Sequence, residues 1–161
     1  MSILSRESVQ RVRDALAQAG STAEIIELTD TARTARDAAS SLGCSLGAIV
    51  KSLAFQCDDE VVMALVAGDR QCLPEELRAA LGRTGDIRIA KADVVRDATG
   101  FAIGGVAPVG HRTRIAMVID ESLRRFDTVY AAAGHPHCVF ATSADELVTI
   151  TGARIAAGIS R

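Results

Sequence analysis

The chain has 161 residues, 48% of them hydrophobic and 24% charged, which predicts one folded, soluble domain with its own core. A net charge of −2 excludes the overall basic field that recruits nucleic acid to many binding proteins. With four Phe, one Tyr and no Trp, the chain also lacks the aromatic platforms of single-strand binders. The core must therefore be built from aliphatic side chains.

Cysteine spacing and the first residues indicate the compartment. The four cysteines, at positions 44, 57, 72 and 138, do not show the two-residue spacing of metal knuckles or redox motifs. Charged residues interrupt the first twenty positions, so no secretory signal is expected there, and no apolar run is long enough to span a membrane. We expect free thiols in a cytoplasmic protein, with no metal and no membrane partner.

Hydrophobic periodicity and turn residues predict alternating helices and strands. Helices are expected over 5–19, 34–42, 73–81, 91–99 and 143–150, with capping boxes at Thr34 and Ser143. Strands are expected over 23–28, 49–57, 60–67, 87–90, 115–119, 128–132, 138–141 and 154–157. The pair 49–57 and 60–67, joined by two aspartates, is typical of a hairpin. We therefore predict a single α+β domain over 1–161.

The stretch 100–110 contains four glycines and one proline between regular segments. Glycine lets a ligand approach the backbone, and Pro108 stiffens the turn. Such a loop can present amide N–H groups to a developing oxyanion. It is also typical of a plain connection between two elements. The spacing matches neither a dinucleotide fingerprint nor a P-loop, so nucleotide binding of those kinds is disfavoured.

Lys51 is the most informative single residue, because the alternation of a strand places it on the same face as Leu53 and Phe55. A lysine on an apolar face must pair, point into a cavity or reach solvent along its stem. A partly desolvated ammonium favours an anionic or carbonyl partner. Both the functional role and the solvent-reaching alternative are open at this stage.

Other candidates carry weaker signals. His135, His137 and Cys138 are the densest group of potential metal ligands, but they lack companions at metal-site spacing. His111 follows the glycine stretch, and Asp120 follows a strand, where it serves equally well as a helix cap. The pair Arg112 and Arg114 is a local basic patch or a solvated surface pair.

Several of these pieces occur together, in order, in one known family. The chain resembles the YbaK/EbsC family, the editing domains associated with prolyl-tRNA synthetase, from about residue 22 onward. The resemblance is carried by I-V-K-S-L-A-F at 49–55, A-L-V-A-G-D-R at 64–70, I-G-G-V-A-P-V-G at 103–110, I-D-E-S-L at 119–123 and A-A-G-H-P-H at 132–137.

The resemblance implies a fold and an activity. The fold is a mixed, mostly antiparallel sheet curled into a partly closed barrel with helices around it. The activity is trans-editing: hydrolysis of the ester joining a wrong amino acid, such as Cys, Ala, Ser or Thr, to proline tRNA. The 3′ end of aminoacylated tRNA is then the substrate, with prolyl-tRNA synthetase as a candidate partner, no DNA and no cofactor.

The resemblance also implies site residues. Catalytic roles fall on Lys51 and on the loop glycines Gly104 and Gly105. Substrate contacts are expected from Val106, Ala107, Pro108, Asp120, Gly134 and His135. The segment 134–137 occurs in only some relatives, so a cysteine-specific activity is not carried over.

Two other functions fit the same sequence. One is a non-catalytic module that binds tRNA ends or a synthetase, and the other is a hydrolase of an unrelated small ester. An activated aminoacyl ester needs orientation and oxyanion stabilisation rather than a strong nucleophile, which agrees with the absence of a Ser-His-Asp pattern.

Overall fold

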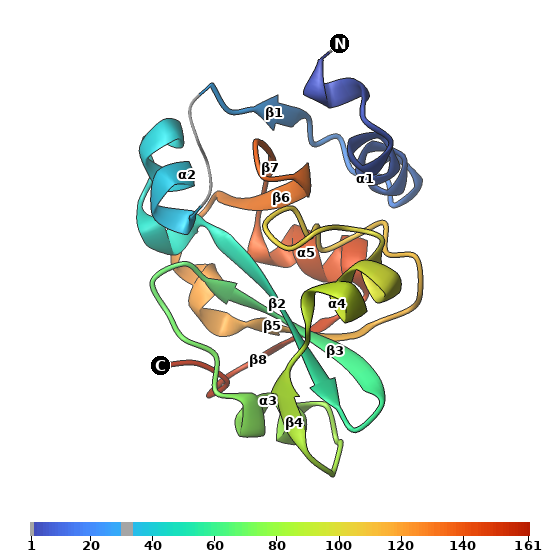
Figure 1. Cartoon of the computed structure of the whole chain (residues 1–161). Coiled ribbons are helices and arrows are strands. Elements are labelled where there is room, and N and C mark those ends of the chain that lie inside the picture. The colour runs from blue at the N-terminus through green and yellow to red at the C-terminus, as the bar shows by residue number, and fades with distance from the viewer. Residues whose placement is uncertain (1, 30–33) are drawn as a thin grey trace.

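The computed structural model describes residues 2–29 and 34–161, and Figure 1 shows the arrangement of their helices and strands. The α-helices are α1 (Glu7–Gln18), α2 (Ala35–Leu42), α3 (Pro74–Ala80), α4 (Ala92–Thr99) and α5 (Ala144–Thr151). Short 3₁₀ helices are η1 (Ile3–Ser5), η2 (Leu46–Ala48) and η3 (Glu121–Arg125). The strands are β1 (Ile25–Glu27), β2 (Val50–Cys57), β3 (Glu60–Ala67), β4 (Ile87–Ile89), β5 (Ala116–Asp120), β6 (Val129–His135), β7 (Cys138–Thr142) and β8 (Arg154–Ala156).

The strands form two sheets. A five-stranded sheet has the order β4-β2-β3-β5-β8, and a three-stranded sheet has the order β1-β7-β6. Pairing is antiparallel except where β5 lies between β3 and β8, parallel to both. The expected α+β class and the mostly antiparallel pairing are confirmed.

The expectation of a partly closed barrel is not confirmed. Neither sheet closes on itself, and the only bridge between them in the described residues is an isolated parallel one joining Ile49 to Tyr130. β2 leaves this bridge and runs on to β4, so the backbones of the two sheets diverge from a single bridge (Figure 1).

Local sequence signals account for most boundaries. Thr34 and Ser143 cap α2 and α5, each accepting a hydrogen bond from the amide three residues on, as the capping boxes predict. Asp58 adopts a positive φ of 52° in the tight turn between β2 and β3. Sequence reasoning ended the strand before Gly134, whereas β6 continues to His135 through a bulge.

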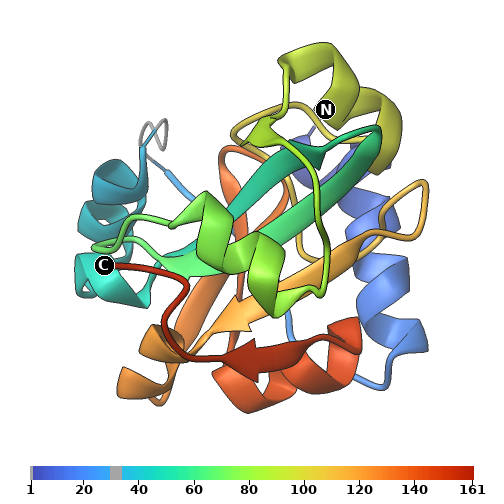
Figure 2. The ribbon, with the colours of Figure 1, turned by 90° about the horizontal axis from the view of Figure 1, so that it is seen from below.

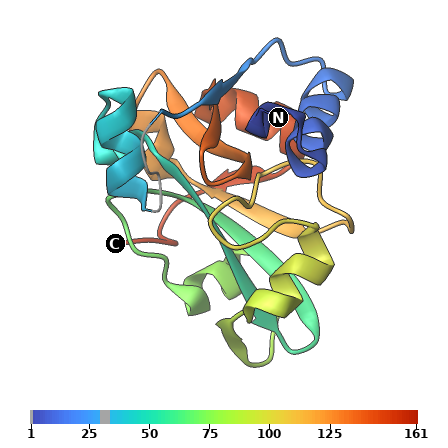
Figure 3. The ribbon, with the colours of Figure 1, turned by 45° about the horizontal axis from the view of Figure 1, so that its top comes forward.

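The five-stranded sheet is buried on both faces. One face shares the larger core with α1, α5 and the three-stranded sheet, and Figure 3 shows α1 beside β6. The other face packs against α3, which lies across it in Figure 2. This second core includes Phe55, Val62, Ala64, Val66, Cys72, Leu77 and Ile159. No helix in the described ranges is both long and apolar enough to cross a membrane.

Candidate functional site

The candidate site lies at an interruption in strand pairing along β2. One edge of β2 pairs with β3 over its whole length. On the other edge, β4 pairs only with residues 55–57, and β6 is bridged only to Ile49. Between these points no strand among the described residues pairs with this edge of β2. Residues 51–53 therefore border open space, and the glycine loop 100–110 passes beside them (Figure 3).

Two cavities meet at this interruption. The first, of about 460 Å³, extends toward β4, and we call it the β4 cavity. The second, of about 340 Å³, extends toward α2 and β6, and we call it the α2 cavity. Six residues line both cavities, and we call them the shared wall: Lys51, Ser52, Leu53, Ile103, Gly104 and Val106. The cavities are thus two chambers of one site.

The two chambers differ in their walls. Apolar side chains dominate the β4 cavity, among them Phe55, Cys72, Pro74, Ala90 and Val95. The α2 cavity is lined in part by small side chains, those of Ala35, Ala38 and Ala132, together with the larger Tyr130 and Pro136. An apolar cleft with a few converging polar groups is the usual form of a small-molecule site.

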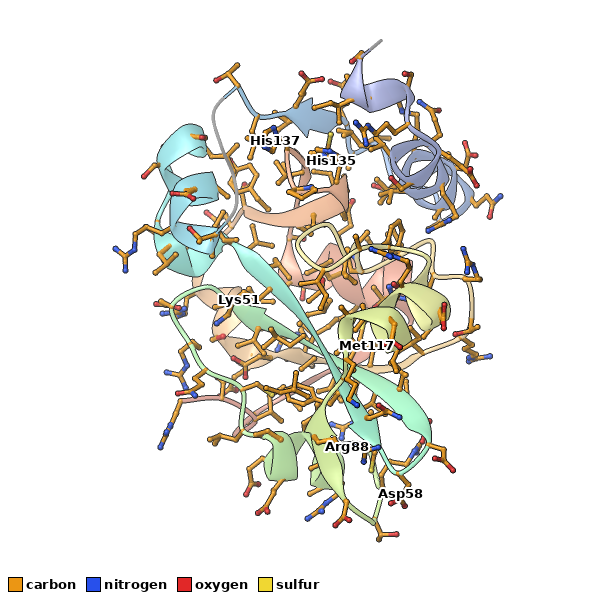
Figure 4. The ribbon with its side chains drawn as sticks, in the orientation of Figure 1. Lys51, Asp58, Arg88, Met117, His135 and His137 are labelled. Atoms are coloured by element: carbon orange, nitrogen blue, oxygen red, sulfur yellow. The ribbon has the colours of Figure 1, made fainter. Side chains whose placement is uncertain are left out.

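Lys51 projects from β2 into this site (Figure 4). Its Nζ donates a hydrogen bond to the main-chain carbonyl of Arg70. Burial lowers the pKa of the Lys51 ammonium below the ordinary lysine value, while the electrostatic effects of Asp69 and, to a lesser extent, Cys72 act in the opposite direction. Lys51 is therefore a partly desolvated cation at the junction of two chambers, as its position on an apolar strand face predicts.

The glycine loop supplies the opposite side of the shared wall. Gly104 has a φ of 98°, a conformation that favours glycine. Among the described residues, the amide N–H groups of Gly104 and Val106 have no hydrogen-bond partner. The N–H of Gly105 instead donates to the carbonyl of Ala102 at 3.0 Å, which closes a turn. Of the expected pair Gly104 and Gly105, only Gly104 thus keeps an N–H without a partner among the described residues, and Val106 in the shared wall is another such residue.

Gly105 has a packing role. A Cβ on Gly105 would lie 2.9 Å from the backbone N and Cα of His135, so only glycine lets the loop pack against the end of β6. Further along, His111 Nε2 lies 2.6 Å from the Ala107 carbonyl, and Arg11 Nε donates to the Gly110 carbonyl at 2.9 Å. These contacts hold the loop rigid, which preorganised donors require.

Four other predicted residues lie outside the two chambers. Ala107 is fully buried, and Pro108 lines a separate open cleft on the other side of the loop. Gly134 packs against α1, where an added Cβ would meet the Ser8 carbonyl oxygen at 2.5 Å. His135 points toward His137 and β1, away from Lys51, and the two histidine rings are 5.4 Å apart (Figure 4).

Asp120 is buried and plays a part that differs from the expected one. Its side chain does not cap η3. Instead, its Oδ2 accepts hydrogen bonds from the hydroxyls of Ser122 and Ser160, the latter at 2.7 Å. It also contributes to raising the pKa of the nearby Cys72 thiol to about 11, after the larger effect of burial. Cys72 is therefore a protonated wall residue at neutral pH rather than a nucleophile.

Sequence reasoning missed Ser52. Its Oγ is buried and has no hydrogen-bond partner among the described residues, although buried hydroxyls are normally paired. The only signal was a hydroxyl beside Lys51 in β2, a mainly apolar strand. In the described part of the chain, no group of three or more His, Cys, Asp or Glu side chains is placed to hold a metal ion.

Comparison with known proteins places this geometry in a family. The sequence profile of the aminoacyl-tRNA editing domain matches residues 29–150. The chain belongs to the aminoacyl-tRNA editing domain family. The resemblance noted from the sequence motifs is thereby confirmed.

Full-length relatives of this editing domain exist as separate proteins. The uncharacterised protein YwhH of Bacillus subtilis is 31% identical over 141 residues, covering 87% of this chain and 88% of YwhH. A crystal structure of a proposed trans-editing enzyme for prolyl tRNA synthetase superposes with a TM-score of 0.87 at 38% identity, covering 94% of this chain and 96% of that one.

A shorter stretch of the chain is similar to part of proline–tRNA ligases. The proline–tRNA ligase of Thermoanaerobacter sp. (strain X514) is 31% identical over 96 residues, which are 59% of this chain but only 17% of the ligase. The similarity to ligases thus concerns one part of a much longer protein.

Proposed function

We propose that this editing domain is a trans-acting deacylase that hydrolyses the ester between a wrong amino acid and proline tRNA. The observation that carries the proposal is the junction of two chambers at Lys51. An aminoacyl-adenosine end has two parts, a nucleoside and an amino acid, joined by one ester. A site with two chambers and one cation between them fits that shape.

The shared wall supplies groups for each part of the reaction. The Lys51 ammonium, which already donates to a carbonyl, binds an oxygen of the ester or of the ribose. The free N–H groups of Gly104 and Val106 stabilise the oxyanion that forms when water attacks the ester carbonyl. The ester C–O bond then breaks, the ribose oxygen takes a proton, and the free amino acid leaves. The unpaired Ser52 hydroxyl is a further donor within the wall.

The tRNA itself must be held largely by its end. With a net charge of −2, the protein has no overall attraction for a polyanion. Relatives include ligases specific for proline and a proposed trans-editing enzyme for prolyl tRNA synthetase, which supports proline tRNA as the carrier and the synthetase as a partner in the cytoplasm.

A panel of charged tRNAs tests the function. Proline tRNA carrying Cys, Ala, Ser, Thr or the correct Pro is incubated with the protein, and release of free amino acid is followed against buffer alone. We expect accelerated release of at least one wrong amino acid, with Pro-tRNA left intact. Binding of the charged tRNA without release of any amino acid would instead identify a non-catalytic binding module.

A further inference from the structure

A continuous chain of hydrogen bonds connects Lys51 with the segment 159–161. The first link is the bond from Lys51 Nζ to the Arg70 main-chain carbonyl. The Arg70 guanidinium then donates two hydrogen bonds to Ser160. Its Nε donates to the hydroxyl Oγ and its Nη2 donates to the main-chain carbonyl oxygen, both at 3.0 Å. Arg70 thus joins the candidate site to a residue ninety positions away in the sequence.

The chain of bonds ends on a buried carboxylate. The Ser160 hydroxyl donates to Asp120 Oδ2 at 2.7 Å, and the Ser122 hydroxyl donates to the same oxygen. Asp120 is 2% exposed and Ser160 is 8% exposed. Hydrogen bonds to a charged acceptor in a protected setting are strong and geometrically defined. Asp120 therefore fixes the Ser160 hydroxyl, which accepts the hydrogen bond from Arg70 Nε.

The backbone reinforces the same connection. Gln71 and Arg161 exchange two main-chain hydrogen bonds of 2.9 Å, and Leu73 N–H donates to the Ile159 carbonyl at 2.8 Å. The segment 71–73 is therefore paired with 159–161 immediately beyond Arg70. The Arg70 carbonyl, which accepts the hydrogen bond from Lys51, is therefore held in place by the Arg70 side chain and by the paired backbone of residues 71–73.

We propose that Asp120, Ser160 and Arg70 are positioning residues for Lys51: they fix the Arg70 carbonyl, and this carbonyl holds the ammonium at the shared wall. A lysine stem has four flexible carbons, so without a fixed acceptor its ammonium samples many positions. The link to hydrolysis rests on the proposed function. The positioning itself does not, because it is a property of the free protein.

The chain offers a direct spectroscopic test, because it has only two lysines, Lys51 and Lys91. In protein labelled with ¹³C,¹⁵N-lysine, each side chain gives its own signals, and Lys91 is an exposed internal control. The charged or titratable groups acting on Lys51 are Asp69, which is paired with Arg125, and Cys72. None of them is changed in the variants below.

Ser160→Ala breaks the link between Arg70 and Asp120, whereas the matched control Ser122→Ala removes the other hydroxyl on Asp120 and leaves the link in place. In Ser160→Ala we expect the Lys51 signals to shift and its pKa to rise toward the ordinary lysine value, because the released ammonium gains water. Lys91 should be unchanged, and Lys51 in Ser122→Ala should remain as in the wild type. Unaltered Lys51 signals in Ser160→Ala, or equal shifts in both variants, would overturn the proposal.

A second variant covers a failure of Ser160→Ala to fold. Arg70→Met keeps the carbonyl and the apolar stem but loses both bonds to Ser160, so the same Lys51 shift is expected. Single-turnover release from a wrongly charged tRNA should fall about 10-fold or more in either folded variant, since misplacing a catalytic group by about 1 Å can cost about 100-fold in rate. Because the lysine signals are recorded without substrate, an inactive wild type would refute the proposed function and still leave the positioning tested.

Discussion

At the residue scale, the proposed hydrolysis depends on the charge of the Lys51 ammonium. Burial lowers its pKa, and the carboxylate of Asp69 opposes that shift. If the charged ammonium acts on the ester, the enzyme-dependent rate of release is at its maximum below the pKa of Lys51 in the folded protein. The rate then declines as the pH rises through this pKa. That decline should begin below the pH at which an ordinary exposed lysine loses its proton.

Replacing Asp69 tests this assignment. In Asp69→Asn the loss of a neighbouring negative charge should lower the Lys51 pKa further, so the alkaline decline begins at a lower pH. Asp69 also pairs with Arg125 at 2.6 Å, and Glu60→Gln, which breaks the exposed pair with Arg83, is the matched control. The measurement is the pH profile of enzyme-dependent release, corrected for hydrolysis in buffer. A decline at the wild-type pH in Asp69→Asn would contradict the assignment.

At the element scale, the glycine loop and β4 present apolar side chains at the β4 cavity. The described residues include three exposed large hydrophobic side chains, and two of them, Ile89 and Ile103, line this cavity with 77% and 60% of their surface exposed. The third, Ile26, lies on β1 and lines neither chamber. Exposed apolar surface at a site is available to cover a ligand.

Ile103→Asp should therefore weaken substrate binding without unfolding the protein. Partial burial of an isoleucine against substrate contributes about 1 kcal/mol, so we expect KM for wrongly charged tRNA to rise roughly fivefold. Ile26→Asp is the matched control and should leave KM unchanged, and thermal unfolding of both variants should resemble the wild type. An equal rise in KM for both variants would show a general charge effect on tRNA rather than a contact at the cavity.

The individual helices and strands were easier to predict from the sequence than the way in which the strands pair into sheets. The capping boxes, the aspartate turn and the helical periodicity are local, so α1, α2, α5 and the β2–β3 hairpin follow from neighbouring residues. The parallel pairing of β5 between β3 and β8 depends on contacts between distant segments. The division of the strands into two sheets also depends on such contacts, and the expected partly closed barrel is not confirmed.

The candidate site was predictable in part for the same reason. Lys51 and Gly104 carry signals of their own, an ammonium on an apolar face and a glycine in a rigid loop. Asp120 carries only the signal of an acid after a strand, and its hydrogen bond to Ser160 spans forty residues. Likewise, nothing local distinguishes Gly105, whose amide closes a turn, from Gly104, whose amide has no partner within residues 2–29 and 34–161.

At the scale of the whole molecule, two sheets diverge from one bridge and leave a gap, and the glycine loop turns that gap into two chambers around Lys51. The second core, which includes Leu77 of α3, packs on the face of β2 that carries Lys51, Leu53 and Phe55. Among the described residues, the shared wall thus combines one cation with two amides that lack hydrogen-bond partners, and under the proposed function an already activated ester needs no nucleophile stronger than water.

We propose that Lys51 acts on the ester, and the presence of just one other lysine, Lys91, allows a direct test. Single-turnover release from wrongly charged proline tRNA is compared for the wild type, Lys51→Ala and Lys91→Ala. Loss of an interaction with the developing charge predicts a fall of about 10²- to 10³-fold for Lys51→Ala, with Lys91→Ala equal to the wild type. Release by Lys51→Ala at the wild-type rate would contradict the claim.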